Sequence, residues 1–266
     1  MRFIVIDKSW LQGVPEETIA EIAATNRLLM PAVLMYELFT TSDEAVKTIC
    51  FRKLIRVQKS IDLLEHVGSF LRFESEKQMP CTPIQNRRLP IVFEFNPRLK
   101  EPNYPFTNEQ RESIEYFHNQ WEIDDVKSFK PLAAGVTVWF PELEGMKAGS
   151  SFESIQPAID KLIKNTDKVK EIYKKLSTTR KGFFPSPEMV DENWAFFRWL
   201  QVYLVYALEY IRKYGAGNID MASKSMPNDR LDIQYLITGT LAKALATGDK
   251  IMKKYFELCC PDGQSV

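Results

Sequence analysis

The sequence predicts an α/β fold in which a parallel sheet is flanked by helices and interrupted by a mainly helical insert. Two observations place strands: a short apolar run near the N-terminus and a short run of small residues near the C-terminus. A third is that helical patterns follow both runs and fill most of the chain between them. With 266 residues, of which 45% are hydrophobic, the chain is long enough to bury one substantial core.

The first predicted strand covers Phe3 to Ile6, four apolar residues that are followed at once by Asp7. A continuous run of this kind fits a strand buried on both faces of a parallel sheet. Because ligands of open parallel sheets bind beyond the carboxyl ends of the strands, Asp7 is a candidate functional acid. The alternative is that Asp7 only caps the following turn or helix.

A second candidate acid, Glu37, lies in a helix that we expect to start at Pro31, a residue suited to the first turn. Its neighbours Val33, Leu34 and Leu38 are apolar. A carboxylate buried among them must be paired, protonated or bound to a cation, because burying a lone charge is very costly. The alternative is a side chain that leans out into solvent.

Two further groups of acids lie near the C-terminus. A helix beginning at Asn228 carries Asp229 and Asp232, which are three residues apart and share a face, although acids are also common in first turns because of the helix dipole. The closing strand, residues 244–246, runs into Thr247 and Asp249 before another helix. Asp249 is either a functional acid or simply the N-cap of that helix.

The middle of the chain predicts the insert. It becomes rich in proline and irregular between residues 79 and 105, and a helix with a Thr107–Gln110 capping box follows over 107–121. We expect a short strand at 136–140, a charged helix at 154–175 and a long aromatic helix at 187–214. The predicted core is therefore residues 1–78 and 222–266, with an insert at 79–221.

The order strand-Asp, helix-Glu, helix-Asp, strand-Thr-x-Asp resembles the PIN-domain nucleases. In that family the first strand ends in an Asp followed closely by Ser or Thr, which here are Asp7 and Ser9. A Pro-led helix carries the Glu, as at Glu37, and the closing strand ends in Thr-x-Asp, as at Thr247 and Asp249. The family's third acid opens a later helix.

Asp232 precedes Asp249 by 17 residues, which is close to the family's usual separation. The resemblance implies a PIN-like sheet and a Mg²⁺- or Mn²⁺-dependent endoribonuclease acting on single-stranded or structured RNA. It also implies roles for particular residues. The catalytic acids and metal ligands would be Asp7, Glu37, Asp232 and Asp249, with Asp229 as an assisting ligand interchangeable with Asp232, and Ser9, Thr247 and Lys8 orienting ligands or substrate.

The chemistry of such a set agrees with this implication. Carboxylates that converge repel one another, and their pKa values rise unless a cation neutralises them. Ligands that are all oxygen suit Mg²⁺ or Mn²⁺ rather than zinc, and such an ion polarises a phosphodiester and lowers the pKa of bound water. Two features depart from the family: Lys8 stands where a small hydroxyl residue is commoner, and Asp232 follows Glu37 by 195 residues.

Basic residues predict where a nucleic acid would lie. The formal net charge is zero, so attraction of a polyanion must come from local patches. Residues 161–181 hold eight basic residues against two acids, and a second basic set follows Glu37. The candidate nucleic-acid-binding residues are Lys170, Lys174, Lys175, Arg180 and Lys181, and the second set is Arg52, Lys53, Arg56 and Lys59. The alternative is that both are ordinary solvated helix faces.

Other classes of protein find little support in the sequence. Only two histidines occur, the four cysteines lack zinc spacing, and no nucleotide-binding glycine loop is found. Few cysteines, no signal-peptide pattern and no apolar stretch able to span a bilayer predict a cytoplasmic protein without membrane contact.

Two rivals to the RNA nuclease stay open. One is a DNA or structure-specific nuclease that uses the same acids. The other is a non-catalytic PIN-like scaffold whose insert makes protein contacts. The resemblance also bears on partners: because many PIN relatives are toxins or RNA-processing enzymes, an antitoxin-like or larger-complex partner, or a homo-oligomer, is compatible with it.

Overall fold

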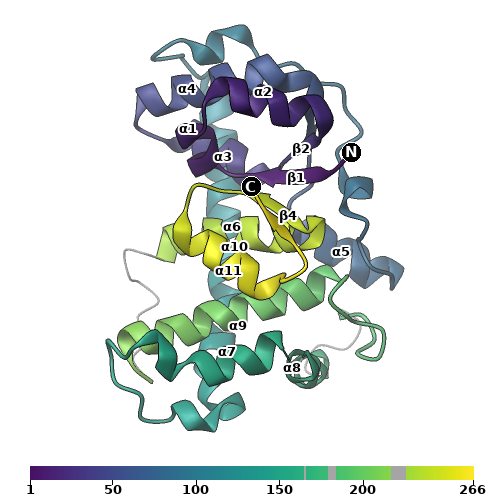
Figure 1. Ribbon diagram of the computed structural model, residues 1–266, viewed down its shortest axis with the longest axis vertical. Coiled ribbons are helices and arrows are strands. Elements are labelled where there is room, and N and C mark those ends of the chain that lie inside the picture. Colours follow the sequence, from purple (N-terminus) through teal and green to yellow (C-terminus); the bar gives the residue numbers. More distant parts are fainter. Residues whose placement is uncertain (165, 179–183, 217–225) are drawn as a thin grey trace. The chain divides into compact units, whose positions relative to one another are not determined.

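The structure, a computed structural model, describes residues 1–164, 166–178, 184–216 and 226–266, with the backbone alone for 117–131 and 226–228. It confirms the α/β class: the described residues contain one parallel sheet in the order β3-β2-β1-β4-β5, flanked by helices (Figure 1). The strands are β1 (Phe3–Ile6), β2 (Arg27–Met30), β3 (Ile61–Leu63), β4 (Ala244–Ala246) and β5 (Gln264–Ser265).

The central strand is β1, which is paired with β2 on one side and β4 on the other. Val5 lies opposite Leu29 of β2 and Leu245 of β4, and all three side chains are fully buried. Burial on both faces explains the unbroken apolar run. Because β1 and β4 are parallel neighbours, their carboxyl ends meet, and the Asp7 N–H donates to the Ala246 carbonyl at 3.1 Å.

The strand β4 confirms the predicted closing strand even though alanine is a poor strand former. Small residues suit this position because the helix α10 packs closely against it. A Cβ placed on Gly239 of α10 would lie 3.2 Å from the Leu245 Cβ. Tertiary packing therefore outweighs the intrinsic preference of the residues in β4.

The helices that follow Asp7, Pro31 and Asp249 begin where those residues predict. Asp7 and Asp249 are side-chain N-caps, and Pro31 occupies the N-cap position of its helix. The helices are α1 (Lys8–Gly13), α2 (Glu16–Thr25), α3 (Ala32–Thr40), α4 (Glu44–Val57), α5 (Val67–Lys77), α10 (Met226–Ala242) and α11 (Lys250–Cys259).

Helix α4 is held against α1 by a buried lysine. The Lys53 ammonium donates to the carbonyl oxygens of Leu11 and Val14, each at 2.6 Å, and of Gln12 at 3.3 Å. It therefore caps the C-terminal end of α1, where helix carbonyls lack partners. The prediction of a basic surface after Glu37 is wrong for Lys53, which is only 5% exposed.

The other basic residues of that set are partly committed to ion pairs. Arg52 and Arg56 both pair with Glu16 of α2, with nitrogen–oxygen distances of 3.1 Å. These contacts join α4 to α2, so two of the cations that the sequence offers for a phosphate path serve packing between helices.

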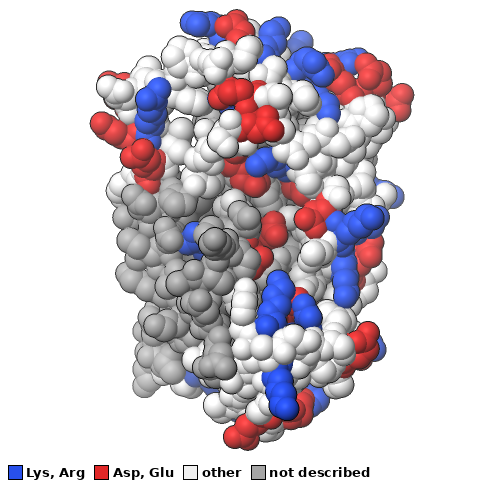
Figure 2. All heavy atoms as spheres, turned by 90° about the vertical axis from the view of Figure 1, so that its left-hand side faces the viewer, with Lys and Arg blue, Asp and Glu red and all other residues white. Residues whose placement is uncertain are grey.

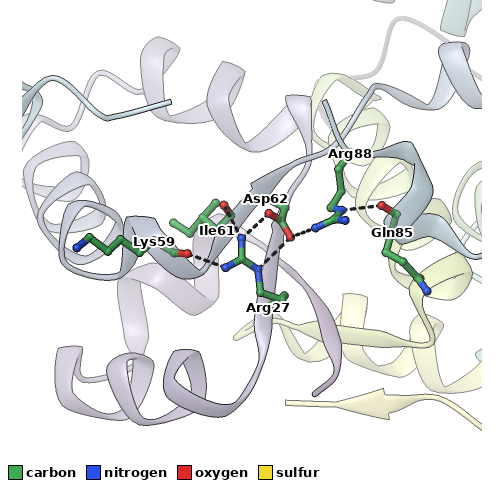
Figure 3. Close-up of polar contacts among 6 residues, drawn as sticks. All are labelled: Arg27, Lys59, Ile61, Asp62, Gln85 and Arg88. Atoms are coloured by element: carbon green, nitrogen blue, oxygen red, sulfur yellow. Dashed lines mark hydrogen bonds and ion pairs between the residues drawn. The ribbon is translucent and has the colours of Figure 1, made fainter. Parts of the chain in front are cut away.

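The amino ends of β2 and β3 are tied by a polar network, which Figure 3 shows. The Arg27 guanidinium donates to the Asp62 carboxylate and to the Lys59 carbonyl at 2.6 Å, while Arg88 donates to Asp62 at 3.0 Å. Burial alone would raise the pKa of Asp62, but the two guanidinium groups outweigh it and lower that pKa. This network lies at the opposite ends of the strands from Asp7.

The chain forms two compact units. The first unit comprises Met1–Phe70, Thr82–Gln120 and Gln234–Val266, and the second comprises Leu71–Cys81 and Trp121–Ile233. The sheet belongs to the first unit. Helix α10 starts in the second unit and ends in the first.

Helices dominate the second unit, with three differences from the sequence prediction. The expected strand at 136–140 is wrong, because residues up to Trp139 continue α6 (Asn108–Trp139). The expected helix over 154–175 is two helices, α7 (Gln156–Ile163) and α8 (Asp167–Ser177). The long aromatic helix is α9 (Ala195–Tyr214), which begins later than residue 187. The predicted Thr107–Gln110 capping box is confirmed at the start of α6.

The N-terminus of α9 is anchored by a buried carboxylate, Glu74. Its two oxygens accept from the N–H groups of Ala195 at 2.7 Å and Phe196 at 3.0 Å, and from the Cys81 N–H at 2.9 Å. Phe196 and Phe197 of this helix are buried and form part of the core. Within the described residues, no helix is long and apolar enough to cross a membrane.

Candidate functional site

Asp7 is the centre of the candidate site because it is a buried carboxylate at the carboxyl end of the central strand. Its side chain accepts from the Trp10 N–H at 2.7 Å, from the Ser9 hydroxyl at 2.8 Å and from the Thr247 hydroxyl at 2.6 Å. The residue is 2% exposed. Every one of these donors is uncharged, and Asp7 forms no ion pair with the described residues.

The loop after β4 brings Thr247 and Gly248 against α1. The Gly248 N–H donates to the Ser9 hydroxyl oxygen at 2.8 Å, and the Asp249 N–H donates to the Thr247 hydroxyl oxygen at 3.0 Å. A Cβ on Gly248 would lie 3.1 Å from the Ser9 carbonyl oxygen. Glycine therefore permits the close approach that lets both hydroxyls donate to Asp7.

Asp249 is the N-cap of α11, which is the alternative role that the sequence allowed for it. One of its carboxylate oxygens accepts from the Ile251 N–H at 2.6 Å and the Met252 N–H at 3.0 Å. The residue is exposed, unlike Asp7. Capping uses only Oδ1, and a carboxylate has lone pairs for further partners on its second oxygen.

Glu37 is held from two sides. The Tyr235 hydroxyl of α10 donates to Oε2 at 2.5 Å, and the Lys8 ammonium lies 3.9 Å from Oε1. The alternative of a freely solvated side chain is therefore wrong, because the Glu37 side chain is only 18% exposed and has both a hydroxyl and a cation as partners.

The pKa values of Asp7 and Glu37 are both raised. Burial raises the pKa of Asp7, the donors from Thr247, Trp10 and Ser9 oppose this rise, and the charge of Asp249 adds to it. Burial likewise raises the pKa of Glu37, against the Tyr235 hydroxyl and Lys8, and Asp7 adds to the rise. The three acids of the first unit thus interact, and a cation beside them would relieve their repulsion.

The remaining predicted acids lie in the second unit. Asp229 accepts a hydrogen bond from the Tyr210 hydroxyl at 2.6 Å, and Asp232 is half-buried. Within α10, Asp232 precedes Tyr235 by three residues, so the two side chains project from one side of the helix. Across the described part of the chain, no three His, Cys, Asp or Glu side chains gather as a ready metal cage.

The predicted basic residues of α8 are partly neutralised. Lys168 and Lys175 both pair with Glu171 at 2.8 Å, and these two ammonium groups lower the pKa of Glu171 to about 2. Lys170 and Lys174 form no ion pair with the described residues, whereas Arg180 and Lys181 lie outside them. On the face drawn in Figure 2, cationic and acidic side chains are interspersed among the described residues.

Sequence reasoning missed two residues of the site, Tyr235 and Gly248. Tyr235 was one turn of helix beyond an acid already singled out, and helical spacing was the signal that pointed to it. Gly248 stood inside the Thr-x-Asp motif, but the need for glycine there is visible only from the approach of Ser9.

The donors of the first unit fit a hard divalent cation. The side-chain oxygens of Asp7, Ser9 and Thr247 lie within hydrogen-bond distance of one another. They are carboxylate and hydroxyl oxygens, which Mg²⁺ and Mn²⁺ prefer. Mg²⁺ keeps several waters and is usually bound through one or two carboxylates plus substrate phosphate, so a cage of three protein ligands is not required. Asp7, buried without a cationic partner, is the residue best suited to hold such an ion.

The chain was compared with protein-family models, curated proteins and solved structures, and none of them matches it. What the fold and the site define is therefore the class alone: an α/β protein with a parallel sheet and acidic side chains at the carboxyl end of its central strand.

Proposed function

We propose that this protein is a PIN-like, Mg²⁺- or Mn²⁺-dependent endoribonuclease. The observation that carries the proposal is the Asp7 carboxylate, which is buried at the carboxyl end of β1, receives only uncharged donors and interacts with Glu37 and Asp249. A buried carboxylate with other acids near it is costly without a cation. The preference for RNA comes from the resemblance to the PIN family.

Each residue of the site has its own role in the proposed hydrolysis. Asp7 anchors the ion, Asp249 and Glu37 add charge, and Ser9 and Thr247 fix the Asp7 carboxylate. The resemblance also implies Asp232 and Asp229 as ligands. When bound, the ion polarises the phosphodiester and lowers the pKa of water. In the overall reaction one bond forms between a water oxygen and phosphorus, one P–O ester bond breaks, and the water proton passes to the leaving oxygen.

The Lys8–Glu37 ion pair favours a second candidate, a non-catalytic PIN-like interaction protein. In this alternative the lysine permanently neutralises Glu37, and Asp7 serves only to cap α1 and bind the loop after β4. The two candidates differ in one measurable property, because only the nuclease gains stability from a divalent ion.

Incubation with mixed-sequence single-stranded RNA in Mn²⁺, in Mg²⁺ and in EDTA tests the proposed activity. We expect metal-dependent cleavage by the parent, with none in EDTA and none from an Asp7→Asn, Asp249→Asn double variant. The matched control is Asp262→Asn, which removes an exposed aspartate paired with Lys243 at 2.5 Å and should cleave like the parent. Competition between RNA and DNA strands of one sequence separates the two substrates.

Thermal unfolding supplies a readout that does not depend on finding the right substrate. An ion that binds only the folded state stabilises it by about 2.7 kcal/mol at 100 times its Kd. Mn²⁺ should therefore raise the Tm of the parent and of Asp262→Asn, but not that of the double variant. Equal shifts in all three proteins would contradict the site, and no shift in the parent would favour the interaction protein.

A further inference from the structure

The helix α11 carries three lysines at the end of the helix where cations are least favourable. Lys250, Lys253 and Lys254 lie in its first half, and its last turn holds no basic residue. The N-terminus of a helix bears partial positive charge, so cations there reduce the stability of the helix. Helix α4, by contrast, begins with Glu44 and has Arg56 in its last turn. Helix stability therefore does not explain the lysines of α11.

The three lysines lie on the exposed face of α11. The opposite face is buried and consists of Met252, Tyr255, Phe256 and Cys259. Lys250 and Lys253 form no ion pair with the described residues, whereas Lys168 and Lys175 of α8 share Glu171. Neither packing nor pairing thus accounts for the two cations on α11, and both are available to a ligand.

The lysine face begins directly beside the candidate acids. Lys250 follows Asp249, and the loop before them is bound to Asp7 through the Thr247 hydroxyl, which donates at 2.6 Å. Helix α11 belongs to the same compact unit as Asp7, whereas α8 belongs to the other unit. A strand held on α11 would therefore lie next to the acidic site.

An apolar side chain stands among the lysines. Ile251 is 63% exposed, although the next residue, Met252, is buried. This combination fits a single nucleic-acid strand, whose phosphates attract lysines while its bases and sugars offer apolar surface. A membrane surface fits less well, because a helix that lies on a bilayer inserts its apolar face, and that face of α11 is already buried in the protein.

We propose that the exposed face of α11, formed by Lys250, Ile251, Lys253 and Lys254, binds the phosphate backbone of single-stranded RNA beside the acidic site. The identity of the polyanion rests on the proposed function, and the proposal makes α11, not α8, the path toward Asp7. Lys250 and Lys254 are about 6 Å apart along the helix axis, so the face can contact neighbouring phosphates of one strand.

The test is the binding of a fluorescently labelled, mixed-sequence single-stranded RNA, measured by anisotropy at several salt concentrations in EDTA, where the proposed cleavage cannot occur. The variant Lys250→Gln, Lys253→Gln should bind more weakly than the parent. Its slope of log K against log salt should be shallower by about 1.4, since each phosphate contact to a single strand contributes about 0.7. The matched control, Lys77→Gln, Lys100→Gln, removes two exposed lysines elsewhere and should bind like the parent.

Two further measurements sharpen the test. Ile251→Ala should weaken binding without changing the salt slope, because an apolar contact releases no counterions. Thermal unfolding checks that Lys250→Gln, Lys253→Gln is folded, and its Tm should equal or exceed that of the parent because two cations leave the positive end of α11.

The possible results separate this proposal from the nuclease activity. Parent-like affinity and slope in the α11 lysine variant would overturn the proposal, and so would an equal loss in the control. Loss of binding to phosphatidylcholine–phosphatidylserine vesicles, with RNA binding unchanged, would assign the face to a membrane and also overturn it. RNA binding that depends on α11, without cleavage by the parent in Mn²⁺, would support the binding face and contradict the nuclease.

Discussion

At the scale of single residues, Asp7 joins three elements through one carboxylate. It ends β1, caps α1 through the Trp10 N–H and accepts from the Thr247 hydroxyl beyond β4. Such a residue contributes to stability only while its donors remain, because a buried carboxylate that loses a partner bears the full desolvation cost. The site is therefore also a structural joint of the first unit.

Replacing Thr247 by valine tests this joint. Thr247→Val removes a donor to a buried carboxylate, and we expect it to lower the free energy of unfolding by about 1.5 to 3 kcal/mol. Thr240→Val is the control, since Thr240 is equally buried but donates only to the Ile237 carbonyl of its own helix at 3.0 Å. Urea unfolding at neutral pH measures both. An equal loss in the two variants would show that the Asp7 contact adds nothing.

Glu74 gives a prediction about pH. Burial raises its pKa, although the N–H donors of Ala195, Phe196 and Cys81 oppose the rise. A carboxyl group whose pKa is higher in the folded than in the unfolded protein adds stability below its unfolded pKa, and that stability is lost as pH rises through the folded pKa. The parent's advantage over Glu74→Gln should therefore be larger near about pH 4 than at pH 7.

Urea unfolding of both proteins at the two pH values measures this difference. Glu74→Gln is expected to be less stable than the parent at both, because the amide cannot accept on both sides and one buried N–H loses its partner at a cost of about 1 to 3 kcal/mol. A parent advantage that grows from pH 4 to pH 7 would reverse the sign and contradict the argument.

Residue identity predicted some of the site and not the rest, for physical reasons. Asp7 and Glu37 were recognisable because an acid next to an apolar run lies close to the core and needs a partner there. Outside the site, the burial of Lys53 was not recognisable, because a lysine in a mixed sequence gives no sign that three carbonyl oxygens lie within reach of its ammonium. The burial of Lys53 depends on partners about 40 residues away in the chain, which the local sequence does not reveal.

At the scale of elements, helix starts that carry a capping residue were predicted better than the other helix boundaries. Caps are local, so Asp7, Asp249 and the Thr107–Gln110 box could be identified from a few residues. The segment 136–140 was misassigned because Val136, Thr137, Val138 and Trp139 favour strands intrinsically, whereas the structure continues α6 through them. Propensity is a weak prior that the surroundings of an element override.

The turn after α9 provides a test at this scale. Gly215 has φ +87°, and a Cβ there would lie 3.1 Å from the Ala148 backbone nitrogen and 3.2 Å from the Met146 oxygen. Gly145 has φ +75° with no atom within 4 Å of its Cβ position. Gly145→Ala should cost about 1 to 2 kcal/mol from the backbone alone, and Gly215→Ala at least about 1 kcal/mol more from crowding.

Thermal or urea unfolding of the two alanine variants separates backbone strain from crowding, because both positions need the left-handed conformation and only one lacks room. If the two variants lost the same free energy of unfolding, the close approach of residues 146–148 to Gly215 would not affect stability.

At the scale of the whole molecule, the fold class was predictable and the strand count was not. Residues 3–6 and 244–246 marked the middle of the sheet, while β2, β3 and β5 are only two to four residues long and lack a distinct periodic pattern. Short strands are defined by their neighbours in the sheet. The division into two units likewise depends on contacts between segments far apart in sequence.

Hydrogen exchange with and without Mn²⁺ tests the location of the site across the molecule. If the ion binds through Asp7 and Asp249, amides of β1, α1 and the first turn of α11 should exchange more slowly in Mn²⁺. Amides of α7 and α8, in the second unit, should be unaffected. Slowing confined to the second unit would place the ion elsewhere.

The position of β4 between β1 and β5 has a consequence for synthesis on the ribosome. About 240 residues separate the end of β1 from β4, so at 5 to 20 residues per second β1 waits roughly 12 to 50 s for its second neighbour. During that interval one edge of an apolar strand lies open, as does the Asp7 carboxylate that Thr247 will later cover. The sheet can therefore close on that side of β1 only after almost the whole chain has been made.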